Sequence, residues 1–516
     1  MSDAISRATA ADRPFAALVA SNPSASAVLT VAGQVASAGG VFGNLGTGTV
    51  TADGGSYIVT GTAAAVNAAL QGVTFTPSSG GLAPTEIGAA LVDITGTSVL
   101  TDTGTAATIL VASGTGDRVV GGGGTDTLLA QADGTVAVGG SGPTTLVGYS
   151  HGSSTLVGGS GATLYQTMGV GTLLYGGTGR ATFDLQSGGS QTIVSGVGGS
   201  LIPLGGARAT VYGQAGDTIQ ASSGEALVVA ATNSVVRFGP GSATVFASAG
   251  DTVGGGSGSG VIVGGTAGGS LVTGRAGSTL IFGVGGTDTV VGGNGATTVV
   301  ATAASSMLVY GAFGPTTFYG DSGSSTVVGG TGGDTVSGGA GGGVLVAGTG
   351  GNSLLYAGSQ PTTLIGGASG DSLYANASGN GLLVAGAGNE TLSASDTSGS
   401  DTLFAGSGAD RIDLGRGAAL VVASTGSSQI DCGAGPDQIA IDAGHAGGSL
   451  ALFGFKLGVD VIHLSGYSAT AAADALASAV AFDKNAHLLG SVTLTLPDAT
   501  KIEFNGAFTL HASVFG

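Results

Sequence analysis

The residues best suited to chemistry in this chain are aspartates that recur inside glycine-rich turns. Gly121–Leu129 (GGGGTDTLL) and Gly329–Ser337 (GGTGGDTVS) both fit the nonapeptide G-G-x-G-x-D-x-U-x, in which U is a large apolar residue. The sixth position of each copy supplies a carboxylate, Asp126 or Asp334. Carboxylate and backbone carbonyl oxygens are the ligands that Ca²⁺ prefers in proteins. These turns are therefore candidate calcium sites.

The elements that must hold these aspartates are short strands between the turns. From residue 113 to 446 the nine-residue period persists with occasional slips, although Thr, Ser, Gly, Asn or Ala often takes the sixth position. Each unit combines a glycine turn, where a positive φ costs little, with a three-residue strand. Two units would make one coil of about 18 residues and build two parallel sheets. We therefore predict an all-β fold centred on a parallel β-roll, a nonapeptide β-solenoid, over 113–446.

Composition fits a solenoid and excludes several classes of protein. Of 516 residues, 106 are Gly and 42% are hydrophobic, while only 8% are charged, compared with about 25% in ordinary soluble proteins. The net charge is −18 with only 12 Lys and Arg, which excludes a nucleic-acid partner because such binding needs clustered cations. No apolar stretch reaches the length of about 18 residues that a membrane span requires, so we expect none.

Catalytic motifs are not evident. The five histidines show no H-E-x-x-H spacing, and no G-x-S-x-G motif occurs. The only cysteine, Cys432, takes a glycine-like position at the head of CGAGPDQIA, where we expect a small buried thiol rather than a nucleophile. We therefore predict a protein that is not an enzyme, with no catalytic residue and no organic cofactor.

Two flanking segments depart from the nonapeptide. After a flexible N-terminus (1–12), residues 13–112 alternate short strands with Gly, Ser and Pro, which predicts a β-sandwich-like domain similar to cadherin-like or immunoglobulin-like modules. Thr62 is the expected N-cap of one helical turn in this domain. Residues 447–516 regain bulky side chains and predict a C-terminal α+β cap. The cap should contain a helix over 471–480 and strands over 491–496 and 500–504.

The nonapeptides and the C-terminal segment together resemble the RTX, or haemolysin-type calcium-binding, proteins of Gram-negative bacteria. The segment FGFKLGVDVIHLSGY (453–467), followed by a strand pair and an apolar end, is similar to the C-terminal region of that family. The resemblance implies a type I secretion signal in the C-terminal cap and an extracellular or cell-surface location. The N-terminus has no Sec-type signal peptide, which fits that route.

The same resemblance implies where calcium would bind. In that family an ion lies between two turns on one edge and is shared by position-six aspartates two repeats, or about 18 residues, apart. No two aspartates near position six of this chain have that spacing. Asp117 and Asp126 differ by nine, as do Asp401 and Asp410, so each pair belongs to opposite edges. The candidate calcium ligands are Asp117, Asp126, Asp288, Asp334, Asn352, Asp371, Asn389, Asp401, Asp410 and Asp437.

Asparagine completes the pairs that come nearest to this spacing. Asp334 would join Asn352, and Asp371 would join Asn389, so we expect Ca²⁺ at few or weak sites. In the alternative interpretation, these side chains only cap turns by accepting hydrogen bonds from backbone N–H groups. Because neutral residues replace most position-six carboxylates, we expect the centre of the roll to fold largely without calcium.

Side chains that face outward could form an association surface. Alternation along a strand should point position eight inward and positions seven and nine outward. Position seven is often threonine: Thr145, Thr155, Thr279, Thr289, Thr317, Thr326 and Thr335. Position nine is often apolar: Val147, Val157, Val263, Val272, Ile281, Val291, Val300, Val309, Val328, Val346, Leu355 and Phe404. Rows of exposed apolar residues usually mark sites of association.

These features together predict a secreted, non-enzymatic structural protein of the extracellular matrix or cell surface. It would associate with itself through its outward sheet faces, as a filament or a sheet, with calcium at a minority of turns. The alternative function is an ice-binding, polysaccharide-binding or adhesin module that uses the outward threonine columns, with a surface polysaccharide as partner.

Overall fold

Strands dominate this structure and helices are few. The computed structural model has 46% strand and 5% helix and forms a parallel β-solenoid, which confirms the predicted fold class. The structure describes residues 13, 15–21, 29–34, 40–52, 54, 56–77, 90–95, 98–149, 153–168, 170–185, 189–197, 199–221, 223–302, 304–376, 380–395, 398–444, 448–482, 490–506 and 510–516. The N-terminus expected to be flexible (1–12) lies outside these residues. The chain divides into two units, Met1–Ala247 and Ser248–Gly516.

The first unit begins with a mainly antiparallel region around aromatic side chains. Its elements are β1 (Leu18–Ser21), β2 (Leu29–Gln34), β3 (Gly40–Gly43), β4 (Thr49–Val50), β5 (Ser56–Gly61), α1 (Ala63–Gly72), β6 (Thr74–Pro77) and β7 (Ala90–Thr95). β2 pairs antiparallel with both β5 and β7. The rings of Phe15, Phe42 and Tyr57 pack with centroids 6.0–6.3 Å apart. Thr62 Oγ1 accepts a hydrogen bond from Ala65 N at 3.4 Å, so the predicted N-cap is confirmed.

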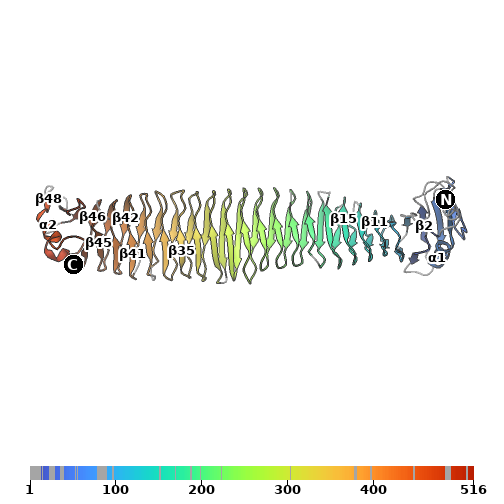
Figure 1. Cartoon of the computed structure of the whole chain (residues 1–516), viewed down its shortest axis with the longest axis horizontal. Coiled ribbons are helices and arrows are strands. Elements are labelled where there is room, and N and C mark those ends of the chain that lie inside the picture. The colour runs from blue at the N-terminus through green and yellow to red at the C-terminus, as the bar shows by residue number, and fades with distance from the viewer. Residues whose placement is uncertain are drawn as a thin grey trace, which may run out of the picture. The chain divides into compact units, whose positions relative to one another are not determined.

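Parallel strands then alternate between two sheets, which we name by strand number. The even sheet of this unit contains β8 (Val99–Asp102), β10 (Arg118–Val120), β12 (Val136–Val138), β14 (Thr155–Val157), β16 (Leu173–Tyr175), β18 (Ser190–Val194), β20 (Arg208–Tyr212), β22 (Ala226–Val229) and β24 (Ala243–Phe246). The odd sheet adds to β7 the strands β9 (Thr108–Ala112), β11 (Asp126–Ala130), β13 (Thr144–Gly148), β15 (Thr163–Thr167), β17 (Ala181–Leu185), β19 (Leu201–Pro203), β21 (Thr218–Gln220) and β23 (Val235–Arg237). Figure 1 shows such coils following one another from β11 to β15. Parallel pairing starts at β7 with β9, and at β8 with β10, ahead of residue 113.

The second unit continues the same two-sheet pattern. Its even sheet contains β26 (Gly260–Val263), β28 (Thr279–Val284), β30 (Thr297–Thr302), β32 (Thr316–Tyr319), β34 (Thr335–Ser337), β36 (Leu354–Tyr356), β38 (Ser372–Tyr374), β40 (Thr391–Ser393), β42 (Ala409–Asp413), β44 (Ser427–Asp431) and β46 (Ser449–Phe453). Its odd sheet contains β25 (Thr252–Gly254), β27 (Leu271–Thr273), β29 (Thr287–Val291), β31 (Ser306–Tyr310), β33 (Ser325–Val328), β35 (Gly343–Val346), β37 (Thr362–Ile365), β39 (Leu382–Val384), β41 (Asp401–Phe404), β43 (Ala419–Val422), β45 (Gln438–Asp442) and β47 (Val461–Ser465).

A C-terminal cap completes the second unit. It consists of α2 (Ala471–Ala477), β48 (Val480–Phe482), β49 (Ser491–Thr495), β50 (Lys501–Asn505) and a 3₁₀ turn (Ala512–Val514). The predicted helix and both predicted strands are present, and β50 pairs in parallel with β46 while β49 pairs antiparallel with β50. β46 and β47 still stack on β44 and β45, so the coils extend beyond residue 446. Among the described residues, no helix has the length and apolar character needed to cross a membrane.

Glycine allows successive coils to approach closely. A Cβ atom on Gly348 would lie 1.6 Å from the carbonyl oxygen of Gly330, and one on Gly448 would lie 1.6 Å from that of Gly426. Any larger residue at these positions would force the coils apart. Glycine is therefore required where turns stack, because it has no Cβ atom.

The central residue of each coil strand points into the interior. Leu364, Leu383 and Leu403, on successive odd strands, are completely buried, while the residues beside them face outward, as predicted. The predicted assignment of inward and outward positions was wrong where a coil contains one residue more than two nonapeptides. Thr252, for example, pairs with Leu271, which lies 19 residues later. The residues buried for this reason are Val272, Thr279, Ile281, Val309 and Leu355. Val147, also predicted to face outward, is buried as well, although it pairs with Leu129 at the expected spacing of 18.

Candidate functional site

Buried carboxylates occupy a recurring place where the chain turns into a strand. We call this the corner position; it lies two residues before the buried central residue of the strand. Asp126 is such a residue and is 1% exposed. Its Oδ1 accepts a hydrogen bond from Thr108 N of the preceding coil at 3.1 Å, and its Oδ2 accepts one from Gly122 N of its own turn at 2.7 Å. The side chain therefore joins two coils through their backbones.

The same bond to the preceding coil recurs in both units. Its acceptors are Asp117, Asp126, Asp217, Asp288, Asp334, Asp371, Asp401, Asp410, Asp437 and Asp460, with N–O distances of 2.7–3.2 Å. A corner N–H group buried without an acceptor would be costly. Polar residues are thus favoured at position six whether or not a metal binds. Calcium at these corners stays a prediction.

The corner positions show which predicted ligands come together. Asp117 lies at the edge of the even sheet and Asp126 at that of the odd sheet, as their separation of nine predicted. The same holds for Asp410 and Asp401, which lie on β42 and β41. Asp288 is the corner residue of β29, where burial raises its pKa.

The two predicted Asp–Asn pairs do not occupy equivalent corners. Ser353, not Asn352, takes the corner that follows Asp334, because Thr335 pairs with Leu354. Asn352 is exposed and has a positive φ of 58°. Asn389 is also exposed, and the buried residue next to it, Glu390, occupies the corner after Asp371. The predicted pairing was wrong because coil length is not fixed at 18 residues; it varies from 17 to 23.

Three acidic side chains occupy successive corners of the even sheet in the second unit. Asp371 and Glu390 directly precede β38 and β40, and Asp410 lies at the start of β42; these three strands pair in order. Glu390 is 2% exposed, and its Oε1 has no hydrogen-bond partner in the described structure. Burial, together with the charges of Asp371 and Asp410, raises the pKa of Glu390 to about 7. Glu390 was not among the predicted ligands, because it replaces the position-six aspartate and follows Asp371 by 19 residues, not 18.

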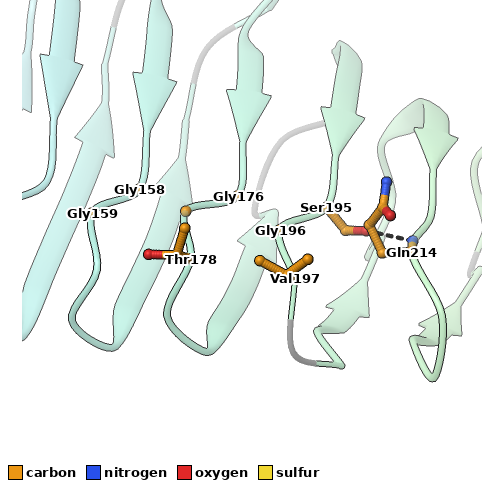
Figure 2. A pocket seen from close by; sticks show the side chains of 9 residues that line it. Gly158, Gly159, Gly176, Thr178, Ser195, Gly196, Val197 and Gln214 are labelled. Carbon is orange, nitrogen blue, oxygen red and sulfur yellow. Dashed lines mark hydrogen bonds between the residues drawn. The ribbon is translucent and has the colours of Figure 1, made fainter.

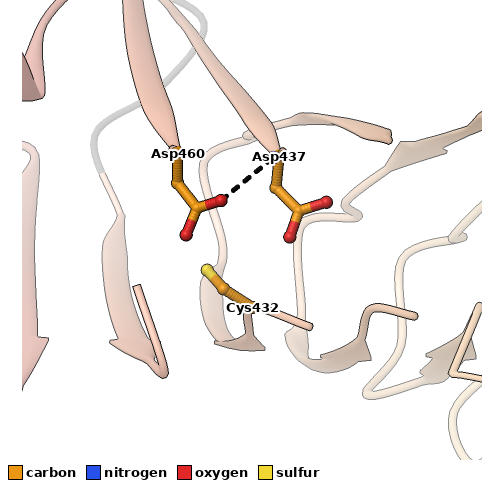
Figure 3. Close-up of side chains that lie close together, drawn as sticks. All are labelled: Cys432, Asp437 and Asp460. Atoms are coloured by element: carbon orange, nitrogen blue, oxygen red, sulfur yellow. Dashed lines mark hydrogen bonds between the residues drawn. The ribbon is translucent and has the colours of Figure 1, made fainter. Parts of the chain in front are cut away.

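A thiol and two carboxylates converge near the C-terminal end of the odd sheet. Among the described residues, Cys432, Asp437 and Asp460 are the group whose possible ligand atoms all lie within 4.8 Å of one another. Figure 3 shows Asp437 and Asp460 descending from neighbouring strands with Cys432 pointing toward them. Burial and the charge of Asp460 raise the pKa of Asp437 to about 7, and the same two causes raise the pKa of the Cys432 thiol. Asp460 was missed because its coil is 23 residues long.

A shallow hollow in the turns of the first unit offers little chemistry. It has a volume of about 430 Å³ and is lined by Gly158, Gly159, Gly176, Gly177, Thr178, Ser195, Gly196, Val197 and Gln214. Figure 2 shows how glycines leave it open and how Ser195 Oγ accepts a hydrogen bond from Gln214 N at 2.8 Å. None of its lining residues carries a charge, so the hollow provides no ionisable acid or base.

From β29 to β43 the outward surface of the odd sheet is largely apolar and has no charged side chain. We call it the odd outer face; it covers β29 to β43. Its first row, in register, is Val291, Tyr310, Val328, Val346, Ile365, Val384, Phe404 and Val422. Its second row is Thr289, Leu308, Thr326, Val344, Thr363, Leu382, Thr402 and Leu420. Tyr310 is 43% exposed and Phe404 is 39% exposed.

Comparison with known proteins adds no relative to this picture. No protein-family model matches the chain, and no curated protein does so either. Inferences about function therefore depend on the three features above: the corner carboxylates, the group around Cys432 and the odd outer face.

Proposed function

We propose that this solenoid is a structural protein whose copies associate through the odd outer face. The observation that carries the proposal is the run of eight paired strands without one charged outward side chain. At about 4.8 Å per strand, the face extends for roughly 34 Å. Soluble proteins seldom leave an apolar surface of that extent without a partner.

A second copy of the same face is the occupant that the surface fits best. Sheets pack face to face at about 10 Å when their apolar side chains interdigitate. The second row alternates threonine with a larger aliphatic residue, as at Thr326, Val344 and Thr363. This row therefore presents ridges at every second strand, and a copy shifted by one strand would place its ridges between them.

Charge also favours pairing between copies through this face. The chain has a net charge of −18, so most of its surfaces repel a second copy. The odd outer face is exempt because Asp288 and Asp401, the acidic residues on its strands, point inward and are 3% and 2% exposed. Contact through this face buries apolar area without bringing carboxylates together.

The alternative of a threonine-based ligand face receives less support here. Outward threonines on the odd outer face occur only at every second strand, because Leu308, Val344 and Leu382 interrupt the row. A flat array that recognises ice or a repeating glycan would need an uninterrupted column at the strand spacing. The apolar row beside it also offers no hydrogen-bonding group apart from the Tyr310 hydroxyl.

Sedimentation velocity of the purified full chain tests this proposal. We expect wild type to form dimers or larger species as its concentration rises, and Ile365→Lys, at the centre of the face, to remain monomeric. Ser337→Lys is the matched control, since it adds the same charge on an outward position of the even sheet. The proposal is overturned if wild type stays monomeric at every concentration, or if the two variants associate equally.

A further inference from the structure

We infer that Cys432, Asp437 and Asp460 form a binding site for one thiophilic divalent cation of the Zn²⁺ type. The inference is independent of the proposed self-association, because it concerns different residues and a different readout. Its starting point is that a sulfur atom and two carboxylate oxygens lie within 4.8 Å of one another (Figure 3).

The backbone holds the two aspartates in place without using all of their oxygens. Asp437 Oδ1 accepts a hydrogen bond from Ala419 N at 3.2 Å. Asp460 accepts bonds from Asp437 N at 3.0 Å and from Lys456 N at 2.7 Å. These bonds hold both carboxylates at successive corners of the odd sheet, so they lie near the thiol before any cation arrives.

Asp437 supplies the observation that points to a ligand. The residue is 1% exposed, yet its Oδ2 makes no hydrogen bond of ordinary geometry. Burial and the charge of Asp460 raise the pKa of Asp437, while the Gly433 N–H, which stands in the place of the turn donor, lowers it without reaching ordinary hydrogen-bond geometry. At several other corners the corresponding oxygen accepts a turn N–H, as Asp410 Oδ2 does from Gly406 at 2.7 Å. Asp401 Oδ2 also lacks a partner, but the one cysteine of the chain lies beside Asp437. A buried oxygen without a full hydrogen bond needs an explanation, and a cation held with the neighbouring thiol would supply one.

The set of donor atoms selects the class of cation. Ca²⁺ and Mg²⁺ bind through oxygen alone, whereas a thiolate favours Zn²⁺ and related metals. Typical distances of about 2.3 Å to sulfur and 2.0–2.2 Å to oxygen require ligand atoms about 3.3–3.7 Å apart in a tetrahedral site. The three side chains meet that requirement after shifts of about an ångström. Binding displaces the thiol proton of Cys432 to solvent, and a water molecule or backbone oxygen can fill the fourth position.

Local charge favours a cation at this place. The charges of Asp460, Asp437 and Asp431 raise the pKa of the Cys432 thiol, and the charge of Lys456 lowers it. The Lys456 ammonium is directed to the carbonyl oxygen of Gly433 at 2.7 Å and does not pair with either carboxylate. A divalent ion would neutralise most of the negative charge that thiolate formation creates.

Cobalt(II) titration of the wild-type full chain is the direct test. Because the chain contains one cysteine, a sulfur-to-cobalt charge-transfer band can come only from Cys432. We expect a band that saturates at one Co²⁺ per chain, disappears when Zn²⁺ is added and persists in millimolar Ca²⁺. Absence of the band would refute the site. So would saturation at one Co²⁺ per two chains, with an absorbance per chain that rises with protein concentration, because two chains would then share the metal.

Variants show whether the carboxylates take part. Asp437→Asn and Asp460→Asn should each weaken Co²⁺ binding at least about tenfold, since removing even an indirect partner of a ligand often costs that much. Cys432→Ser should abolish the band while the far-ultraviolet circular dichroism stays unchanged. Asp410→Asn is the matched control, because Asp410 is a buried corner aspartate with no thiol beside it. Equal affinity in Asp437→Asn, Asp460→Asn and wild type would overturn the assignment, and the wild-type titration decides the matter if a variant fails to fold.

Discussion

Two stretches of the even sheet in the second unit provide different acceptors for their corner N–H groups. At β28 and β30 the corner residues are neutral, and Thr279 N and Thr297 N donate to the backbone oxygens of Ala296 and Pro315 at 2.9 and 3.0 Å. From β34 to β42 the corners are largely acidic, and side chains accept the corner N–H groups instead. Ser353 N and Glu390 N donate to the carboxylates of Asp371 and Asp410, and Asp334 N donates to Ser353 Oγ. The coils are alike in both stretches. Carboxylates at corners are therefore one of two ways to satisfy the backbone and not a requirement of the fold.

Removing a corner carboxylate should give the largest difference in the free energy of unfolding between the two stretches. Asp371 accepts hydrogen bonds from Ser353 N, Gly367 N and Ala368 N at 2.8–3.0 Å. Asp371→Ala leaves these donors without an acceptor, so we expect a loss of about 3 kcal/mol or more in the free energy of unfolding, measured by urea denaturation at pH 5.

Thr297→Ala is the control in the neutral stretch. Its corner N–H already donates to a backbone carbonyl, so we expect a loss of about 1 kcal/mol or less. If both substitutions destabilise the chain equally, the carboxylate does not hold the coils together in the way that the hydrogen bonds indicate.

Between these two stretches, only the acidic one should lose stability as pH rises. The pKa of Glu390 is raised from 4.5 to about 7, so the folded chain binds this proton more tightly than the unfolded chain does. The resulting stabilisation is complete below about pH 4.5 and is lost as pH rises through 7, by about 3 kcal/mol. Glu390→Gln imitates the protonated form and should be more stable than wild type at pH 8 but not at pH 4.5.

Hydrogen exchange locates this pH effect. After correction for the intrinsic pH dependence of exchange, protection of β38 to β42 should fall between pH 5 and 8, while protection of β28 and β30 should not. A uniform fall across both stretches would place the titrating group elsewhere. Asp437, whose pKa is also raised to about 7, should produce a similar local effect at β45.

Calcium removal should have the smallest effect on the folding of either stretch. Neutral corners leave no carboxylates to repel one another, and the acidic corners already accept backbone hydrogen bonds. We expect the far-ultraviolet circular dichroism of the full chain to be the same in excess calcium chelator as in millimolar calcium. Conversion to random coil on chelation would show that the acidic stretch needs an ion after all.

Much of the architecture could be predicted because it follows from local pattern. The glycine period indicates the coils, Thr62 marks the start of α1, and the returning bulky residues mark the cap helix and strands. The corner partners could not be predicted in the same way. They depend on coil length, and a single extra residue before Leu354 replaces Asn352 with Ser353 beside Asp334.

The group around Cys432 shows the same limit more sharply. Asp437 was recognisable from its nonapeptide, but Asp460 lies 23 residues later in a segment that resembles no repeat. The proximity of Cys432 arises because it takes a glycine position, and its side chain is therefore directed to the corner column. Such contacts between coils of unequal length become visible only when the strands are paired.

The corner hydrogen bonds also give the solenoid a direction. At the ten aspartate corners that bond to a preceding coil, the donor belongs to the earlier coil and the acceptor to the later one, as with Thr316 N and Asp334. A coil is therefore finished only when the next segment of the chain arrives. A polypeptide that emerges from its N-terminus would carry one incomplete coil at its growing end. Stacking of coils ends where a segment such as the cap pairs with the last coil strand, as β50 does with β46.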